Sequence, residues 1–190
     1  MSPQLAGELE RCVAAGGVAV FPTDTVYGLC CDPESERAVA RLYELKGRAP
    51  DKPAAVMFFS LGDALAALPE LEPRTRAVVE EILPGPVTLL LRNPLGRFPL
   101  AGGGESLGLR VPAGPLALSR PVLQSSANHA GGPAARRLSD VPPAIRRDAD
   151  LVVDGGELPG VASTVLDLRD YERGGDKKVV RAGAWEPPQV

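Results

Sequence analysis

Residues 18–28 read VAVFPTDTVYG, and this stretch decides the expected fold class. Its first four residues, Val18 to Phe21, are apolar and predict a short buried strand that Pro22 stops. The polar residues that follow carry three hydroxyl groups, and Gly28 lets the backbone turn. Open α/β sheets bind ligands at the carboxyl ends of their strands, so this loop is a candidate binding segment. An ordinary polar turn between a strand and a helix would show the same pattern.

The rest of the chain alternates between helical and extended patterns. One helix is expected over residues 4–15, and a second begins with Asp32 as its N-cap and Pro33 in its first turn and ends at Gly47. Further helices are expected at 61–68 and 74–83, and strands at 54–59, 87–92, 107–111, 122–125, 151–153, 164–168 and 179–181. A short polar turn separates the last two strands, which predicts a hairpin and therefore a mixed sheet. Since no linker is visible, we expect a single α/β domain over residues 1–190, a twisted mixed β-sheet with flanking helices.

Composition narrows the classes of function. The 190 residues are 44% hydrophobic, which is enough for a core without disulfides or metals, and the net charge is −3. Proteins with a broad phosphate footprint are usually basic, so the arginines are expected to converge on something small. The odd count of three cysteines and the adjacency of Cys30 and Cys31 indicate a reducing, cytoplasmic location. The apolar segment 13–21 is too short to span a membrane.

Two further stretches carry chemically useful side chains. Residues 46–48 read KGR at the end of the second expected helix, and Lys52 follows. These cations predict either a phosphate clamp or a simple complement to the helix dipole. Residues 124–128 read QSSAN after an apolar strand, where Ser126 and Asn128 could bind one ligand or satisfy their own turn.

Three arginines complete the candidates, and several common signatures are missing. Arg110, Arg136 and Arg181 lie at or beyond expected strand ends, where each could bind a ligand or face solvent. The sequence has no Walker A motif, so that kind of phosphate loop is excluded. The single histidine, His129, lies in a glycine-rich loop and gives no support to a catalytic triad.

Taken in order, these stretches resemble the YrdC family of threonylcarbamoyl-AMP synthases, from about Val18 to Gly183. The motifs that carry the resemblance are PTDTVYG at 22–28, KGR at 46–48, PGPVT at 84–88, LRVP at 109–112, SAN at 126–128 and STVLD at 163–167. The resemblance implies a YrdC-like twisted α/β sheet around a large, concave, positively charged cavity.

The resemblance also implies a set of site residues. Lys46 and Arg48 are the expected catalytic cations. The expected ATP contacts are Arg48, Lys52, Ser106, Asn128, Arg136 and Arg181. The expected threonine contacts are Thr25, Met57, Arg110, Ser126 and Ser163, with Met57 at a position where many relatives carry histidine.

The expected reaction converts L-threonine, bicarbonate and ATP to threonylcarbamoyl-AMP and pyrophosphate, for threonylcarbamoyladenosine formation in tRNA. Mg²⁺ is expected to arrive with the phosphates of ATP, with no dedicated metal site and no tightly bound cofactor. The expected partner is a downstream threonylcarbamoyl transferase complex acting on tRNA, with weak RNA binding left open and no membrane. Two alternatives remain: a carbamoyl-adenylating relative, and a non-catalytic RNA-binding or ribosome-maturation module of the same fold.

Overall fold

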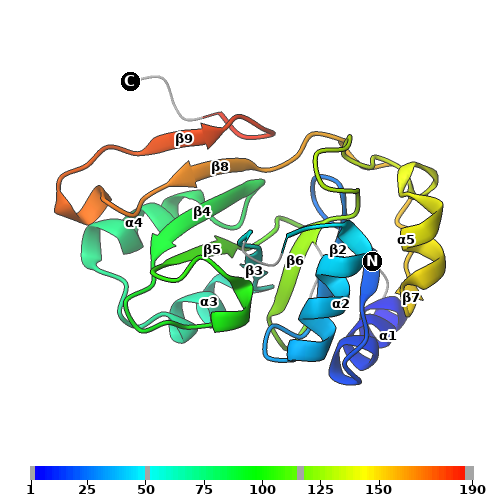
Figure 1. Cartoon of the computed structure of the whole chain (residues 1–190). Coiled ribbons are helices and arrows are strands. Elements are labelled where there is room, and N and C mark those ends of the chain that lie inside the picture. The colour runs from blue at the N-terminus through cyan, green and yellow to red at the C-terminus, as the bar shows by residue number, and fades with distance from the viewer. Residues whose placement is uncertain (1–2, 50–51, 115–117, 187–190) are drawn as a thin grey trace.

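The computed structural model describes residues 3–49, 52–114 and 118–186. Within these ranges nine strands form one sheet, in the order β7-β1-β2-β6-β3-β5-β4-β8-β9 (Figure 1). The strands are β1 (Ala19–Pro22), β2 (Tyr27–Cys31), β3 (Ala55–Met57), β4 (Val87–Arg92), β5 (Ser106–Arg110), β6 (Val122–Ser126), β7 (Leu151–Val152), β8 (Thr164–Asp167) and β9 (Lys178–Arg181). The helices are α1 (Pro3–Ala14), α2 (Glu36–Lys46), α3 (Leu61–Ala67), α4 (Pro73–Ile82) and α5 (Pro143–Asp148), with short 3₁₀ turns at Pro99–Ala101, Leu138–Asp140 and Tyr171–Arg173.

The sheet is mixed, as the sequence predicts. Strand β7 pairs in parallel with β1, β3 with β5, and β4 with β8, whereas the other neighbours are antiparallel. The last two strands form the expected hairpin, β8 and β9, at one end of the sheet (Figure 1).

Residues 23–26 connect β1 to β2 in a β-hairpin, so the alternative of a polar turn between a strand and a helix is wrong, and strand β2 was missed. Pro22 is still part of β1 and pairs with Tyr27, and Phe21 pairs with Gly28. Strand β2 is buried along its whole length, because both faces of the sheet are covered here. A strand buried on both faces lacks the alternation by which strands are usually recognised in a sequence.

Two helix assignments also differ from expectation. Helix α2 begins at Glu36, and its N-cap is Ser35, whose hydroxyl accepts from the amide of Ala38, so the assignment of this role to Asp32 was wrong. Ser35 is a standard capping residue and stands one residue before an acidic first turn. The short helix α5 was missed, because six residues are too few to show helical periodicity.

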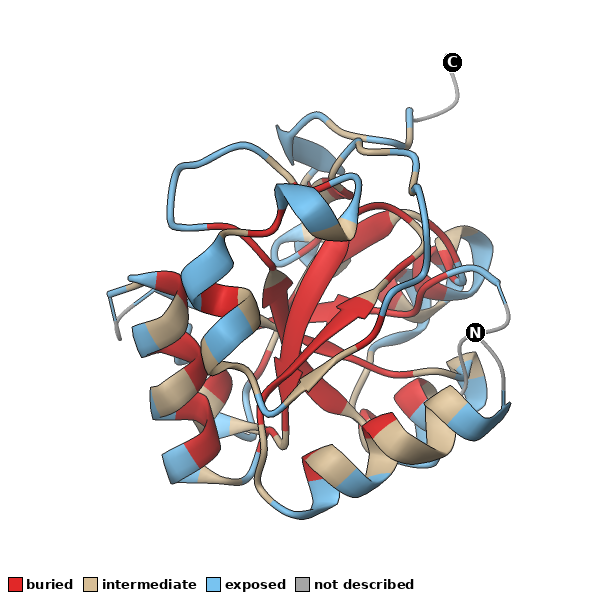
Figure 2. Cartoon of the chain, turned by 90° about the vertical axis from the view of Figure 1, so that its right-hand side faces the viewer, coloured by how far each residue is buried: buried red, intermediate tan, exposed pale blue. Residues whose placement is uncertain are grey.

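Each face of the sheet has its own apolar core. In β1, Val20 packs in the larger core with side chains from α2, α3, α4 and α5, whereas Ala19 and Phe21 point to the other face. That second core is smaller and receives Leu9 and Val13 of α1. Figure 2 shows the consequence: the strands at the centre are buried, and the helices are buried mainly along the side that meets the sheet. Helix α1 covers only one end of its face, and the remainder of that face is open to the site described below.

The first prediction concerns Gly183, which follows β9. A Cβ at this position would lie 2.3 Å from the Ala162 carbonyl oxygen and 2.6 Å from the Ser163 carbonyl carbon. Since both are backbone atoms, Gly183→Ala should displace the chain there and lower the free energy of unfolding by about 1–3 kcal/mol. Gly7→Ala, inside α1, is the matched control: its Cβ would make an ordinary contact 3.5 Å from Arg11. Urea unfolding measures the free energy of unfolding of both variants. If Gly183→Ala were as stable as Gly7→Ala, the close backbone contact would not be what requires glycine at position 183.

Candidate active site

The cavity exists because small residues line up across one face of the sheet. Residues paired across strands share a face, and here Gln124 of β6 pairs with Ala55 of β3, Ala55 with Gly108 of β5, and Gly108 with Leu90 of β4. Ala55 and Gly108 leave the space above the sheet unfilled. A cavity of about 560 Å³ opens at this place, and all four residues line it.

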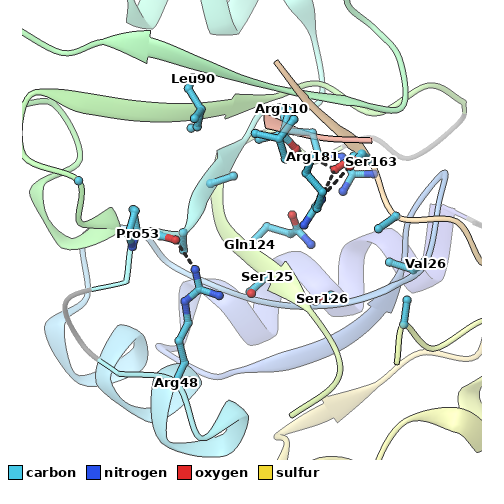
Figure 3. Close-up of a pocket in the computed structure, with 18 of the residues that line it drawn as sticks. Val26, Arg48, Pro53, Leu90, Arg110, Gln124, Ser125, Ser126, Ser163 and Arg181 are labelled. Atoms are coloured by element: carbon cyan, nitrogen blue, oxygen red, sulfur yellow. Dashed lines mark hydrogen bonds between the residues drawn. The ribbon is translucent and has the colours of Figure 1, made fainter. Parts of the chain in front are cut away.

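Arginine dominates the charge of the cavity wall. Arg48, Arg110, Arg169 and Arg181 all line the cavity, and no Asp, Glu or His is among its lining residues within the described ranges. Figure 3 shows three of these arginines, Arg48, Arg110 and Arg181. Arg110 and Arg169 pair with carboxylates that lie outside the lining, whereas Arg48 and Arg181 have no carboxylate partner in the described part of the chain. The cavity is therefore suited to an anionic ligand.

Arg110 is held in a fixed orientation at the end of β5. Its side chain is 3% exposed, and its Nη2 donates to Asp24 at 2.6 Å and to the hydroxyl of Thr25 at 2.5 Å. The second carboxylate oxygen of Asp24 accepts from the amide of Ala113, which fixes the carboxylate in turn. Burial lowers the pKa of the Arg110 guanidinium, and the neighbouring carboxylate of Asp24 partly offsets this lowering. The guanidinium therefore stays charged. Its Nε is buried and has no hydrogen-bond partner among the residues that the structure describes.

Arg181 reaches the same cavity from β9. Its Nη2 donates to the carbonyl oxygen of Ser163 at 2.7 Å and to the Ser163 hydroxyl at 3.2 Å (Figure 3). The Ser163 hydroxyl also lies 2.9 Å from the hydroxyl of Thr88. Partial burial of its guanidinium, together with the charge of Arg110, lowers the pKa of Arg181, although the residue as a whole is exposed. Two cations that repel each other across a cavity favour an anion between them.

Lys46 supports the cavity wall from behind. It is only 2% exposed and is not among the lining residues. Its ammonium donates to the carbonyl oxygens of Ser126 and Asn128 at 2.6 and 2.9 Å, and lies 3.2 and 3.1 Å from their side-chain oxygens. The Ser126 hydroxyl in turn donates to the Asn128 side chain at 2.6 Å. Lys46 thus orients two residues that do face the cavity.

The same burial makes Lys46 sensitive to pH. Desolvation, with a smaller contribution from the charge of Arg48, lowers the pKa of Lys46 to about 8. Arg48 itself donates to the backbone carbonyls of Lys52 and Pro53, which hold its guanidinium at the cavity mouth (Figure 3). Arg48 thus lies on the cavity side of the wall, and Lys46 lies behind the wall, against Ser126 and Asn128.

The structure gathers most of the expected site residues and separates others. Seven of them line the cavity: Arg48, Ser106, Arg110, Ser126, Asn128, Ser163 and Arg181. Thr25 contacts Arg110 from behind and is fully buried. Met57 is also fully buried, in the core under α1, so an apolar side chain there fills space. Arg136 is exposed and pairs with Glu157, and the side chain of Lys52 faces solvent.

Some residues of the site were not singled out from the sequence. Asp24, which lies outside the cavity lining, is within a motif already quoted, and its pairing with Arg110 connects residues 86 apart, which no local pattern can show. Gln124 stands two residues before Ser126 and therefore on the same face of β6, a signal that alternation along a strand could have given. Arg169 follows β8 and could not be told from a surface arginine.

Other features of the described residues bear on the chemistry. They contain no group of three or more His, Cys, Asp or Glu side chains placed to hold a metal ion. They also contain no helix long and apolar enough to cross a membrane. All three cysteines are free, and burial raises the pKa of Cys31 to about 12, which makes it a poor nucleophile.

Comparisons with known proteins agree with this geometry. The threonylcarbamoyl-AMP synthase of Xanthomonas euvesicatoria is 37% identical over 181 residues, which cover 88% of this chain and 95% of that protein. The threonylcarbamoyl-AMP synthase of Pyrococcus abyssi is 32% identical over 167 residues, and this chain spans 49% of its length. The crystal structure of P. abyssi Sua5 complexed with L-threonine superimposes with a TM-score of 0.84 at 29% identity, over 96% of this chain and 55% of that one.

A family model covers almost the whole sequence. The model for Sua5, YciO and YrdC proteins, described as "Telomere recombination", matches residues 11–183. This range contains every strand of the sheet and every residue that lines the cavity in the described part of the chain. The chain belongs to the Sua5/YciO/YrdC family.

Proposed function

We propose that this protein is an L-threonylcarbamoyladenylate synthase, which converts L-threonine, bicarbonate and ATP to threonylcarbamoyl-AMP and pyrophosphate. The observation that carries the proposal is the cavity of about 560 Å³ with four arginines and several hydroxyl and amide groups on its wall. A cavity of this charge suits a substrate with phosphates and a carboxylate together. Support also comes from a relative of matching length that is named threonylcarbamoyl-AMP synthase.

The wall divides into two proposed subsites. On one side, Arg48, Ser106, Asn128 and Arg181 bind ATP, with Lys52 and Arg136 assisting from outside the wall. On the other, Arg110, Ser126 and Ser163 bind threonine, with Thr25 and Met57 supporting them from the protein interior. A fixed guanidinium such as that of Arg110 can bind the amino-acid carboxylate through two parallel hydrogen bonds.

The reaction needs two bond-forming steps. The neutral amine of threonine attacks the carbon of bicarbonate, the C–N bond forms, the C–OH bond breaks, and the hydroxyl leaves as water with one proton from the nitrogen. A carboxylate oxygen of the resulting N-carboxy-threonine attacks the α-phosphorus of ATP, and pyrophosphate leaves. Charge builds on the phosphate oxygens in the second step, where Arg48 and the nearby charge of Lys46 stabilise it. No step requires a covalent enzyme intermediate.

Several wider assignments belong to the same proposal. Mg²⁺ enters with the phosphates of ATP, because hard oxygen ligands are what it prefers. The product passes to a threonylcarbamoyl transferase complex that modifies tRNA, in the cytoplasm, where free cysteines such as these persist.

The proposal is tested by incubating the protein with radiolabelled threonine, bicarbonate and ATP. We expect a labelled adenylate on chromatography and one pyrophosphate for each adenylate. Arg48→Ala should lower the rate at least about tenfold, which is about 1.4 kcal/mol in the barrier. A carbamoyl-adenylating enzyme would release pyrophosphate with carbamoyl phosphate and ignore threonine, and an RNA-binding module would release none. Either result would refute the proposal.

A second prediction separates the two subsites through Arg110. Arg110→Lys keeps the positive charge but loses the planar pair of donors, so threonine binding should weaken by about 1–3 kcal/mol. ATP binding should change much less. Calorimetry with each ligand alone measures both affinities. If ATP affinity fell and threonine affinity stayed constant, Arg110 would belong to the nucleotide subsite.

A third prediction uses the lowered pKa of Lys46. Because this pKa is about 8, the ammonium is charged at pH 7 and mostly neutral at pH 9. ATP affinity of the wild type should therefore fall across this range by about fivefold, or about 1 kcal/mol, the scale of one lost charge near the phosphates. Lys46→Met should bind ATP more weakly at pH 7 and show no such fall. Calorimetry at three pH values measures both proteins, and parallel pH profiles would exclude Lys46 as the titrating group.

A further inference from the structure

Gln124 presents an unused amide inside the cavity. Its side chain is 6% exposed, and Figure 3 shows it pointing from β6 into the open space. Its amide has no hydrogen-bond partner among the described residues, whereas Ser126 and Asn128 on the same strand end are bonded to Lys46. The described residues contain buried unpaired side-chain atoms only at Glu70 and Arg110, so the Gln124 amide is open to the cavity, where a ligand or water can pair with it.

The surroundings of Gln124 are shaped to leave the amide free. A Cβ at Gly28 would lie 3.0 Å from Nε2 of Gln124, so glycine at that position keeps space for the amide. On its other side Gln124 pairs with Ala55, whose short side chain leaves the cavity open. The long side chain thus lies between two small neighbours and ends in the cavity.

The chemistry of the wall limits what the amide can recognise. The four arginines of the wall supply only donors, and no carboxylate lines the cavity in the described part of the chain. Whichever way the amide of Gln124 is turned, it offers an acceptor beside a donor. It therefore complements a group in which an O–H or N–H stands next to a carboxylate oxygen.

Bicarbonate and N-carboxy-threonine share that edge. Bicarbonate has a hydroxyl on the carbon that carries its charged oxygens, and the carbamate has an N–H in the same position. In each, the hydrogen can donate to the amide oxygen of Gln124 while a carboxylate oxygen accepts from its NH₂ group.

We propose that Gln124 binds the one-carbon carboxylate, first as bicarbonate and then as the carbamate of N-carboxy-threonine. The inference rests on the function proposed above. In the first step the C–N bond forms, the C–OH bond breaks and water leaves, so the amide exchanges an O–H for an N–H and keeps the carboxylate oxygen. Gln124 lies two strands from Arg110, about 10 Å across the sheet, which places it within reach of the amine of a threonine whose carboxylate Arg110 holds.

The test uses variants that separate hydrogen bonding from volume. Gln124→Met has a similar length without the hydrogen bonds, and Gln124→Glu keeps an oxygen acceptor but replaces the NH₂ donor with a negative charge. Gln4→Met is the matched control, because Gln4 lies exposed on α1, outside the cavity lining, and donates to the exposed Glu8. Thermal unfolding of each variant verifies that the fold is retained.

The readouts are the KM for each substrate and the affinity for threonine in degassed, bicarbonate-free buffer. In Gln124→Met and Gln124→Glu we expect the KM for bicarbonate to rise at least about tenfold, as for the loss of hydrogen bonds to a charged group. The KM values for threonine and ATP, and the threonine affinity without bicarbonate, should stay within about twofold of the wild type. Gln4→Met should match the wild type in every measurement.

Each contrary outcome has a separate meaning. An unchanged KM for bicarbonate would overturn the role of Gln124 and leave the proposed function standing. An equal loss of threonine affinity in bicarbonate-free buffer would show that Gln124 binds threonine itself, which also overturns the inference. A wild-type protein that forms no adenylate would refute the proposed function, and the inference would fall with it.

Discussion

The site depends on one constraint: a single face of the sheet must pack against apolar side chains at one end and line the cavity at the other. At the apolar end, Phe21, Met57 and Val122 pack under α1 and are fully buried. At the cavity end the same strands carry Ala55 and Gln124, and β5 carries Gly108. Since side chains two residues apart share a face, two residues along β3 or β6 separate core from cavity. The change from apolar core to cavity is therefore set by the size and polarity of the side chains, and the strands keep their direction.

The cavity holds its positive charge at an energetic cost that a ligand can offset. Partial burial and the charge of Arg110 both lower the pKa of Arg181, so the two guanidinium groups destabilise each other at the cavity wall. Asp24 neutralises one of them from behind the wall and leaves the cavity side free of negative charge. Carboxylates on the cavity wall would repel phosphates. Because Asp24 lies outside the lining, it offsets the cost of burying the Arg110 charge and leaves the attraction of the wall for anions intact.

The sequence predicted most strands because apolar runs bounded by glycine and proline are a local signal. It predicted which residue types belong to the site through motifs, and the structure brings seven of those residues to one cavity. It could not show that Lys46 faces away from the open space, because a helix end fixes where a side chain starts and not which oxygens surround its tip. Four oxygens of Ser126 and Asn128, about 80 residues away, lie around the ammonium, and that arrangement arises from tertiary packing alone.

Arg181 shows how a weakly buried element can still place a site residue. All four residues of β9 are exposed, so apolar burial does not fix the register of this strand. Leu166 pairs with Val179 and Val165 pairs with Arg181, which leaves Val180 as an extra residue in a bulge. Without the bulge, Val180 would oppose Val165, a cavity residue, and Arg181 would pair beyond it. The bulge therefore points the guanidinium into the cavity, where Ser163 binds it, and the close approach of Gly183 to Ala162 holds the chain in place just after the strand. The position of the Arg181 guanidinium is therefore set by the bulge at Val180 and by the contacts of Ser163 and Gly183, and not by packing in the hydrophobic core.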